Sequence, residues 1–195
     1  MNKTTLGHIS DVRMGVTLRG RDATRSAPDG SCHMIRISDL SNDGKLIQED
    51  LLCIAPQESI NPDLFLRPGD VILPNRGTRT AAHVFDLSLT NVLVGAQFYI
   101  IRPKPEVAMP EYVAWFLRNE TTAQHLQTRR KGTLVQTLQR RDILELSLPL
   151  PPLPEQAAIV ALDLLAVQER EISSRLSQLR FIYNQRRLLQ SASTR

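Results

Sequence analysis

The sequence is poor in aromatic residues, in cysteine and in long apolar runs. Aromatic side chains make up 5% of the 195 residues, so a core must be built mainly from Leu, Ile, Val and Ala. Cys32 and Cys53 are the only cysteines, and their spacing is not that of metal ligands, which favours two reduced thiols. No apolar stretch approaches the ~20 residues that span a bilayer, and the first residues lack the apolar run of a signal peptide. We therefore expect a soluble, cytoplasmic protein with no membrane partner.

Catalytic signatures are also missing. The sequence has no phosphate-binding glycine loop, no zinc-protease or serine-hydrolase motif and no paired Cys/His cluster. Asn61-Pro62-Asp63-Leu64 matches part of an amino-methyltransferase signature, but its third and fourth residues differ, which favours an ordinary turn. Asp43-Gly44-Lys45 contains the Asp-x-Lys of many nucleases, yet an Asn-Asp-Gly sequence is typical of a solvated turn. The sequence predicts a non-catalytic chain that binds neither a metal nor a cofactor of its own.

The charge balance is basic and unusually rich in arginine. The formal net charge is 24 − 20 = +4, and only four of the 24 cations are lysine. Arginine offers a planar fork that binds phosphate or a guanine edge through two hydrogen bonds. A GC-rich genome would produce the same bias, so composition alone is compatible with a nucleic acid partner without requiring one.

Residues 1–150 have the pattern of a mixed α+β domain with many short elements. Apolar, β-branched runs predict strands at residues 34–37 and 70–73 and one longer, half-buried strand at residues 91–101. Pro110-Glu111 predicts the start of a helix, with proline at the first helical position and a carboxylate at the positive end of the dipole. Four apolar residues at helical spacing would form its buried face: Tyr112, Val113, Phe116 and Leu117.

A proline-rich segment separates this domain from a second region, residues 151–195. Four prolines between Pro149 and Pro154 favour extended backbone. Residues 155–190 contain neither proline nor glycine, which predicts a single helix of roughly 50 Å at 1.5 Å per residue. That length exceeds what a small domain needs for its own packing.

The predicted helix carries one apolar stripe, here called the helical seam. Its members recur at intervals of three, four and seven residues, interrupted by Glu169 and Arg186, and they are Leu162, Leu165, Ile172, Leu176, Leu179 and Tyr183. Such spacing is typical of a helix packed lengthwise on another helix. We predict an intermolecular helical partner over folding back onto the chain's own domain.

Three clusters combine cations with small hydrogen-bonding residues and are candidate double-stranded DNA contacts. Their arginine forks and hydroxyls suit phosphates and base edges, although each cluster alone could be an ordinary solvated loop. The candidate residues are Arg19, Arg21 and Arg25; Asn75, Arg76, Thr78, Arg79 and Thr80; and Arg129, Arg130, Lys131, Thr133 and Gln136.

Five segments together resemble the specificity (S) subunits of Type I restriction–modification systems. The most specific is Leu148-Pro149-Leu150-Pro151-Pro152-Leu153-Pro154-Glu155-Gln156 with Ile159, similar to the family's "PLPPLxEQxxI" sequence. The others follow in the family's order and cover nearly the whole chain: Leu6-Gly7-x-Ile9-x-x-Val12-x-x-Gly15, residues 35–40, residues 66–73 with Arg76-Gly77, and Gly132-Thr133 with Leu138.

The resemblance implies a target recognition domain over residues 1–150 and a conserved helix over residues 151–195. It implies that the chain has no active site and directs methyltransferase (M) and restriction (R) subunits to DNA, with S-adenosylmethionine used by the M subunits. Family members usually carry two recognition domains and two helices, whereas this chain has one of each. The resemblance also implies that the helix packs with an antiparallel mate. We therefore expect a half-length form that makes a homodimer through an antiparallel coiled coil of its helix and recognises a two-fold symmetric, bipartite DNA site.

Two other interpretations remain open. The chain could be the specificity module of another methylation-based phage-defence system with a different enzyme partner. It could also be a structural adaptor whose coiled coil is the functional part and whose basic loops are incidental.

Overall fold

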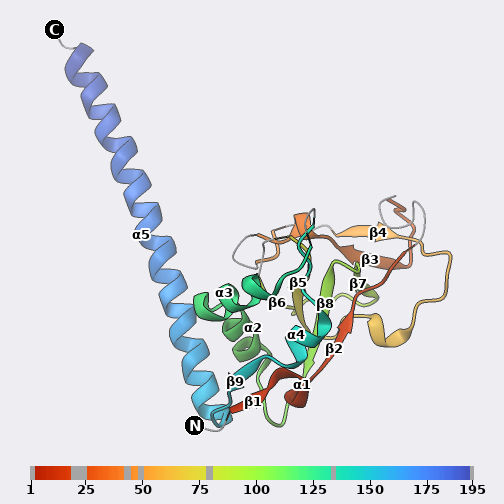
Figure 1. Ribbon diagram of the computed structural model, residues 1–195. Coiled ribbons are helices and arrows are strands. Elements are labelled where there is room, and N and C mark those ends of the chain that lie inside the picture. The colour runs from red at the N-terminus through yellow and green to blue at the C-terminus, as the bar shows by residue number, and fades with distance from the viewer. Residues whose placement is uncertain are drawn as a thin grey trace. The chain divides into compact units, whose positions relative to one another are not determined.

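The computed structural model of the chain describes residues 3–18, 26–41, 45–47, 51–77, 81–132 and 135–193. These residues form two compact units, Met1–Ala157 and Ala158–Arg195. The first contains strands and short helices, and the second is helical (Figure 1). The mixed α and β architecture with a long C-terminal helix confirms the predicted fold class. The antiparallel coiled coil, and a domain boundary between residues 150 and 151, stay predictions.

The larger sheet of the first unit has the strand order β2-β8-β5-β6 and is antiparallel throughout. Its strands are β2 (Ser10–Met14), β5 (Val71–Pro74), β6 (His83–Val84) and β8 (Phe98–Pro103). Pro74 lies opposite Phe98 and Met14 lies opposite Tyr99. The end of β5, the end of β2 and the start of β8 therefore meet at one end of this sheet.

The smaller sheet has the order β4-β3-β7, in which β3 pairs antiparallel with β4 and parallel with β7. Its strands are β3 (Cys32–Ile35), β4 (Leu52–Ile54) and β7 (Val92–Val94). The prediction of a single strand over residues 91–101 is wrong, because β7 and β8 belong to different sheets. The chain turns between them, where the amide of Phe98 donates to the carbonyl of Gly95 over 3.0 Å.

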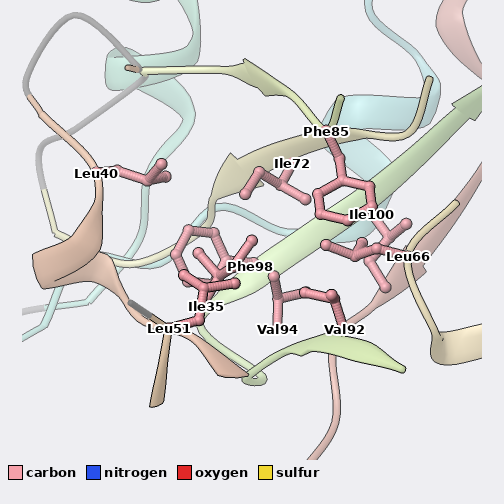
Figure 2. Packing of buried hydrophobic residues seen from close by; sticks show 10 residues of the cluster. All are labelled: Ile35, Leu40, Leu51, Leu66, Ile72, Phe85, Val92, Val94, Phe98 and Ile100. Carbon is pink, nitrogen blue, oxygen red and sulfur yellow. The ribbon is translucent and has the colours of Figure 1, made fainter. Parts of the chain in front are cut away.

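The main core lies between the two sheets (Figure 2). Side chains alternate across a strand, so every second residue of a strand contributes to one face. Ile35 of β3, Ile72 of β5 and Ile100 of β8 belong to this cluster. In β7, Val92 and Val94 belong to the main core, whereas Leu93 between them joins a second cluster with Met34 and Ile54, on the other side of the smaller sheet. Both faces of the smaller sheet are thus apolar.

Helices pack on the larger sheet and on one another. Helix α2 (Pro110–Arg118) packs against β5, β6 and β8, and α3 (Glu120–Arg129) packs against α2. The predicted start of α2 at Pro110 is confirmed, and three of its four expected core residues are buried, namely Tyr112, Val113 and Leu117. Two further short helices, α1 (Leu6–Ile9) and α4 (Arg140–Leu144), pack together beside β2.

The proline-rich segment is tied to the start of the chain. Strand β9 (Ser147–Pro149) pairs antiparallel with β1 (Lys3–Thr5). The hydroxyl of Tyr112 donates to the carbonyl of Pro149 over 2.8 Å. Proline has no backbone N–H, and it is tolerated in an edge strand at a position where the pairing needs no donor. Pro149 can therefore occupy β9.

Helix α5 runs over Leu153–Ser193 and is longer at both ends than the predicted range of residues 155–190. Pro154 therefore lies inside the helix and not in the extended segment that we expected. A proline is tolerated in the first helical turn because the N–H groups of that turn have no intrahelical acceptor. Within the described part of the chain, no helix has the length and apolar content needed to cross a bilayer.

The other predicted strands are shifted along the sequence by one or two residues. Strand β3 ends at Ile35, because a 3-10 turn, η1 (Ile37–Asp39), follows it. The buried carboxylate of Asp39 accepts hydrogen bonds from the backbone N–H and the guanidinium of Arg36. The Arg36-Ile37-Ser38-Asp39 sequence thus forms a self-capped turn. A second turn, η2 (Pro62–Leu64), is capped by the side chain of Asn61, as expected of Asn-Pro.

Candidate nucleic-acid interface

Two of the three predicted DNA-contact clusters meet at one end of the larger sheet. Asn75 directly follows β5, and its amide donates to the carbonyl of Gln97, just before β8, over 2.9 Å. Residues 129–132 follow α3, and residues 135–138 return beside Asn75. The two clusters are more than fifty residues apart in the sequence, so backbone pairing and not sequence proximity brings them together.

Thr137 lies between the two clusters and pairs with both. Arg76 and Thr137 form an antiparallel bridge, flanked by bonds from Gly77 to Gln136 (3.0 Å) and from Leu138 to Asn75 (2.8 Å). On its other side, Thr137 exchanges both backbone hydrogen bonds with Lys131, at 3.0 and 2.8 Å. Directly opposite residues share one face of a ladder. Arg76, Thr137 and Lys131, here called the Thr137 row, therefore project from the same face.

The members of this small ladder differ in burial. Arg76 and Lys131 are exposed and Thr137 is half-buried, whereas their neighbours Arg130 and Leu138 are buried. Asn75, which precedes Arg76, is buried as well. The ladder thus presents cations outward and packs its other face into the domain.

The inward face is held by a buried guanidinium. The two terminal nitrogens of Arg130 donate to the carbonyls of Asn75 (3.1 Å) and Pro74 (3.3 Å). Burial lowers the pKa of Arg130, and charge-assisted bonds to carbonyls offset part of that desolvation. Asn75 donates its side-chain amide to the carbonyl of Ala96 over 2.9 Å. Both side chains fasten the end of β5 to its neighbours.

A tyrosine from the larger sheet supports the ladder from below. The Tyr99 hydroxyl donates to the carbonyl of Leu138 over 2.9 Å. Burial is the main reason that the pKa of Tyr99 is raised, so the phenol stays protonated and able to donate. The strand segment that carries Thr137 is therefore anchored at its C-terminal side.

The exposed cations of this region differ in their partners. Arg129 lies 3.6 Å from the carboxylate of Asp142. Among the described residues, no carboxylate pairs with Arg76 or with Lys131. The exposed Gln136 accepts a hydrogen bond from the side chain of Gln127 over 3.0 Å, which orients its amide. The arrangement offers unneutralised donors to an anion and one oriented amide beside them.

Glycines at two turns allow this geometry. Gly132 has a φ of +120°, and a Cβ atom there would lie 2.4 Å from the carbonyl oxygen of Val135. Gly77 has a φ of +77°, a conformation that favours glycine although the space around it is open. The turn after Lys131 therefore requires glycine for steric reasons, and the turn after Arg76 favours it for conformational ones.

Several predicted contact residues lie outside the described residues. These are Arg19, Arg21, Arg25, Thr78, Arg79, Thr80 and Thr133. The chain that precedes the first group is described as far as residue 18, and the amide of Val16 donates to the carbonyl of Val94 over 2.8 Å. At Gly15 a Cβ atom would lie 2.3 Å from the carbonyl oxygen of Gly95, so only glycine fits. As DNA contacts, all the predicted residues stay a prediction.

The helical seam is solvent-exposed along its whole length. Its six side chains have exposed fractions between 46% and 68%, and they are Leu162, Leu165, Ile172, Leu176, Leu179 and Tyr183. A second stripe, Leu164, Ile182 and Leu189, is also exposed and lies about a third of the way round the helix from the seam. The second unit therefore leaves two apolar stripes in water, and Phe181 and Leu188, which belong to neither stripe, are exposed as well.

The sequence motif included Gln156 but did not predict its role in fixing the start of α5. Gln156 is fully buried, and its side-chain nitrogen donates to the carbonyls of Val107 (2.9 Å) and Pro151 (2.8 Å). Its side-chain oxygen accepts from the amide of Met109 over 2.9 Å. Hydrophobic periodicity does not single out a glutamine. Its position in the first helical turn after a proline-rich segment, however, could have predicted a role in anchoring the helix.

Sequence analysis also missed the role of the Pro68-Gly69-Asp70 sequence. Gly69 has a φ of +90°, and the buried Asp70 accepts two 2.7 Å bonds from the guanidinium of Arg102 on β8. The same carboxylate accepts from the amide of Arg67 over 2.8 Å. The hydrogen bonds that Arg102 donates to Asp70 are the main reason that the pKa of Arg102 is raised. This pair joins β5 to β8 at the end opposite the Thr137 row.

The described residues contain no group of three or more His, Cys, Asp or Glu side chains placed to hold a metal ion. What the interface offers is hydrogen-bond donation and positive charge. Both suit recognition of a polyanion.

Comparison with known proteins was made by sequence and by structure. No family model and no curated protein matches the sequence. A chain from a structure on complex assembly and conformational transition of the type I R-M system superposes with a TM-score of 0.64 at 21% identity, covering 96% of this chain and 43% of that one.

Two further structures give the same result. The S subunit of a Type I restriction-modification system from M. genitalium has a TM-score of 0.56 at 17% identity, with 87% of this chain and 39% of that chain covered. The HsdS subunit from Thermoanaerobacter tengcongensis has a TM-score of 0.59 at 22% identity, with 86% and 37% covered. This chain thus spans about two-fifths of the length of each structure that it matches. It has the fold of these specificity subunits, which confirms at the level of the fold the resemblance predicted from its motifs.

Proposed function

We propose that this chain is the DNA sequence-specificity subunit of a Type I restriction–modification system. The observation that carries the proposal is the fold match, which extends over 96% of the chain at a TM-score of 0.64. The motifs that suggested the family also have structural roles here, since Gln156 anchors the helix and Asp70 pairs with Arg102. Motifs and fold therefore support the same family independently of overall identity.

The proposed unit of function is a homodimer. The chain covers 37% to 43% of the structures that it matches, and the exposed apolar seam of its helix supports pairing with a second copy. It has one mixed α and β unit and one helix where the family's usual members have two of each. A two-fold dimer supplies the second recognition domain and the second helix from a copy of the same chain.

The helical seam is the proposed dimer contact, in an antiparallel coiled coil. Fully burying an aliphatic side chain contributes about 1.5–3 kcal/mol, so six exposed apolar residues along one stripe represent a large stabilisation that the single chain leaves unused. Two-fold symmetry of the dimer would place two identical recognition domains on DNA. The expected target is a bipartite site with symmetric halves.

The second apolar stripe supports a further helical partner. Leu164, Ile182 and Leu189 are exposed and would remain uncovered when a single helix packs on the seam, because the two stripes are about a third of a turn apart. We assign this face to the methyltransferase (M) subunits, which would bind S-adenosylmethionine themselves. The restriction (R) subunit would join through them, and the chain described here would perform no chemistry.

The experiment is a comparison of DNA methylation in cells that carry or lack this chain. With the chain and its neighbouring methyltransferase present, we expect one bipartite, two-fold symmetric motif to be methylated throughout the genome. Deletion of the chain alone should abolish methylation of that motif, because the methyltransferase subunits would no longer be directed to it.

The outcomes separate the competing interpretations. A methylated motif that is unchanged by the deletion would contradict the proposal and favour a structural adaptor. The deletion could instead abolish methylation of a continuous motif, or the partner enzymes could differ from methyltransferase and restriction subunits. Either outcome would favour a specificity module of another phage-defence system. Purification of the chain with its partner enzymes identifies which enzymes those are.

A further inference from the structure

We propose that the Thr137 row binds a phosphate group of the DNA backbone and contributes affinity without reading bases. The inference rests on the proposed function, since it assigns a role within the same DNA interface. It concerns Arg76, Thr137 and Lys131, which backbone pairing places side by side on one face of the ladder.

The first argument is geometric. Residues that lie directly opposite on paired strands have Cβ atoms about 4.5–5.5 Å apart. Thr137 is the middle member of the row, so the two cations flank its hydroxyl at one such spacing each. Arginine and lysine side chains are long enough to meet above a threonine. Their donors can converge on one tetrahedral anion above Thr137, whose hydroxyl makes a long 3.4 Å hydrogen bond to the carbonyl of Val135.

The second argument is electrostatic. Arg76 and Lys131 flank Thr137 on one face of the ladder, so their like charges lie about 10 Å apart at Cβ, two strand spacings, and repel each other. Some surface arginines of the described part of the domain have carboxylate partners, as Arg67 has Asp63 and Arg141 has Glu145. Among the described residues, no carboxylate forms an ion pair with Arg76 or Lys131. An external anion would complete the row.

The third argument concerns the chemistry of the donors. A guanidinium and an ammonium donate hydrogen bonds and accept none, and a phosphate oxygen only accepts. Base edges in the major groove present mixed patterns of donors and acceptors, which side-chain amides match best, apart from guanine. The oriented amide nearby is that of Gln136, which lies outside the row. The row therefore fits the part of DNA that is the same in every sequence.

The fourth argument is that the backbone of the row is already ordered. Four backbone hydrogen bonds hold the ladder, and Arg130 and Tyr99 fasten its inner side. A fixed backbone with exposed cationic side chains binds an anion without having to fold first. Arg130 acts in this scheme as a positioning residue.

The test measures how affinity for DNA depends on salt. The full-length chain and its variants are titrated against a double-stranded DNA of random sequence, because phosphate contacts need no particular target. Each phosphate contact contributes about 0.9 to the slope of log K against log salt. Because the row binds a single phosphate, we expect the double variant of Arg76→Ala and Lys131→Ala to lower the slope by about one, and each single variant to lower it by less.

Matched variants control for charge and folding. Arg67→Ala removes the same charge at the opposite end of β5, where the side chain already pairs with Asp63, and should leave the slope near its wild-type value. Arg76→Lys keeps the charge and should retain most of the slope. Thermal unfolding of all variants should match that of the wild type, because the substituted side chains are exposed.

The result that overturns the inference is a double variant with the wild-type slope, or a wild-type chain that does not bind the random duplex. Sequencing the duplexes retained from a random pool keeps this separate from the proposed function. An enriched motif that is the same for wild type and double variant supports both proposals. A motif that changes in the double variant shows base reading by the row and contradicts the inference alone. No enriched motif, with slopes that fall as expected, contradicts sequence specificity and leaves the row standing.

Discussion

Leucine side chains help to form the buried core of the first unit of the chain and are exposed in the second. In the first unit, Leu73 and Leu93 are fully buried. In the second unit, Leu162 and Leu176 have exposed fractions of 67% and 46%. Burial of apolar surface is the main favourable term in folding, so the first unit has a core of its own, whereas the second leaves its apolar side chains in water. The comparison teaches that leucine content is a poor guide to stability unless the partner surface is known.

The largest expected effect concerns the exposed apolar side chains of the second unit. Replacing Ile172, Leu176 and Leu179 by glutamate would place three charges in the helical seam. Each change loses the burial of an aliphatic group and adds desolvation of a carboxylate, so the homodimer should weaken by about a thousandfold or more. Light scattering or sedimentation at micromolar concentration should then show monomers.

The control for this prediction lies on the same helix. Ser173, Ser177 and Asn184 form a polar stripe away from both apolar faces. Glutamate at these positions adds the same charge and should leave the dimer intact. A seam variant that remains dimeric would show that the seam is not the dimer contact.

The second prediction compares one substitution in both units. Leu73→Ala removes a fully buried side chain and should lower the free energy of unfolding of the first unit by about 2–5 kcal/mol. Leu176→Ala should change that free energy by less than about 0.5 kcal/mol, because its side chain is exposed within the chain.

Trp115 makes the measurement selective. It is the only tryptophan and lies in α2, so its fluorescence during denaturation reports the first unit. Leu176→Ala should instead weaken dimerisation by about tenfold. Equal losses of unfolding free energy in the two variants would mean that the seam packs within its own chain.

The third prediction concerns the junction of the two regions. Gln156→Ala removes two donated bonds and one accepted bond and leaves the amide of Met109 without its partner. The first unit should be destabilised by about 1–3 kcal/mol, with dimerisation unchanged. Gln168→Ala is the matched control, because that glutamine is exposed on the same helix. A Gln156 variant as stable as the control would mean that the anchor contributes nothing.

Local sequence patterns predicted those parts of the fold that depend on local chemistry. The start of α2 at Pro110 and the turn at Asn61 follow from capping rules that act within a few residues. The split of residues 91–101 into β7 and β8 was not predictable in this way. It depends on the close approach of Gly15 to Gly95, some eighty residues away, which no local pattern records.

The candidate interface shows the same division. Composition and spacing identified the cationic clusters, but which side chains face outward depends on pairing with Thr137. Arg129, Arg130 and Lys131 are equivalent in sequence terms, yet the structure pairs the first with Asp142, buries the second and exposes the third. Sequence could indicate the segment and not the roles within it.

The smallest expected effect concerns pH and the surface of the first unit. Hydrogen bonding from Arg13 is the main reason that the pKa of Asp63 is lowered, and Arg67 adds to it. A lowered pKa means that the carboxylate stabilises the folded state above its unfolded pKa of about 3.9, and this contribution is lost as the pH falls through the folded value. We expect part of the acid destabilisation below about pH 4 to come from Asp63 and to shrink at high salt, because the site is exposed. Asp63→Asn should flatten that part of the profile of unfolding midpoint against pH. The helical seam has no carboxylate among its six apolar members, so the proposed dimer should be as stable at pH 5 as at neutral pH. An Asp63 variant with the wild-type acid profile would show that its ion pairs with Arg13 and Arg67 do not stabilise the folded unit.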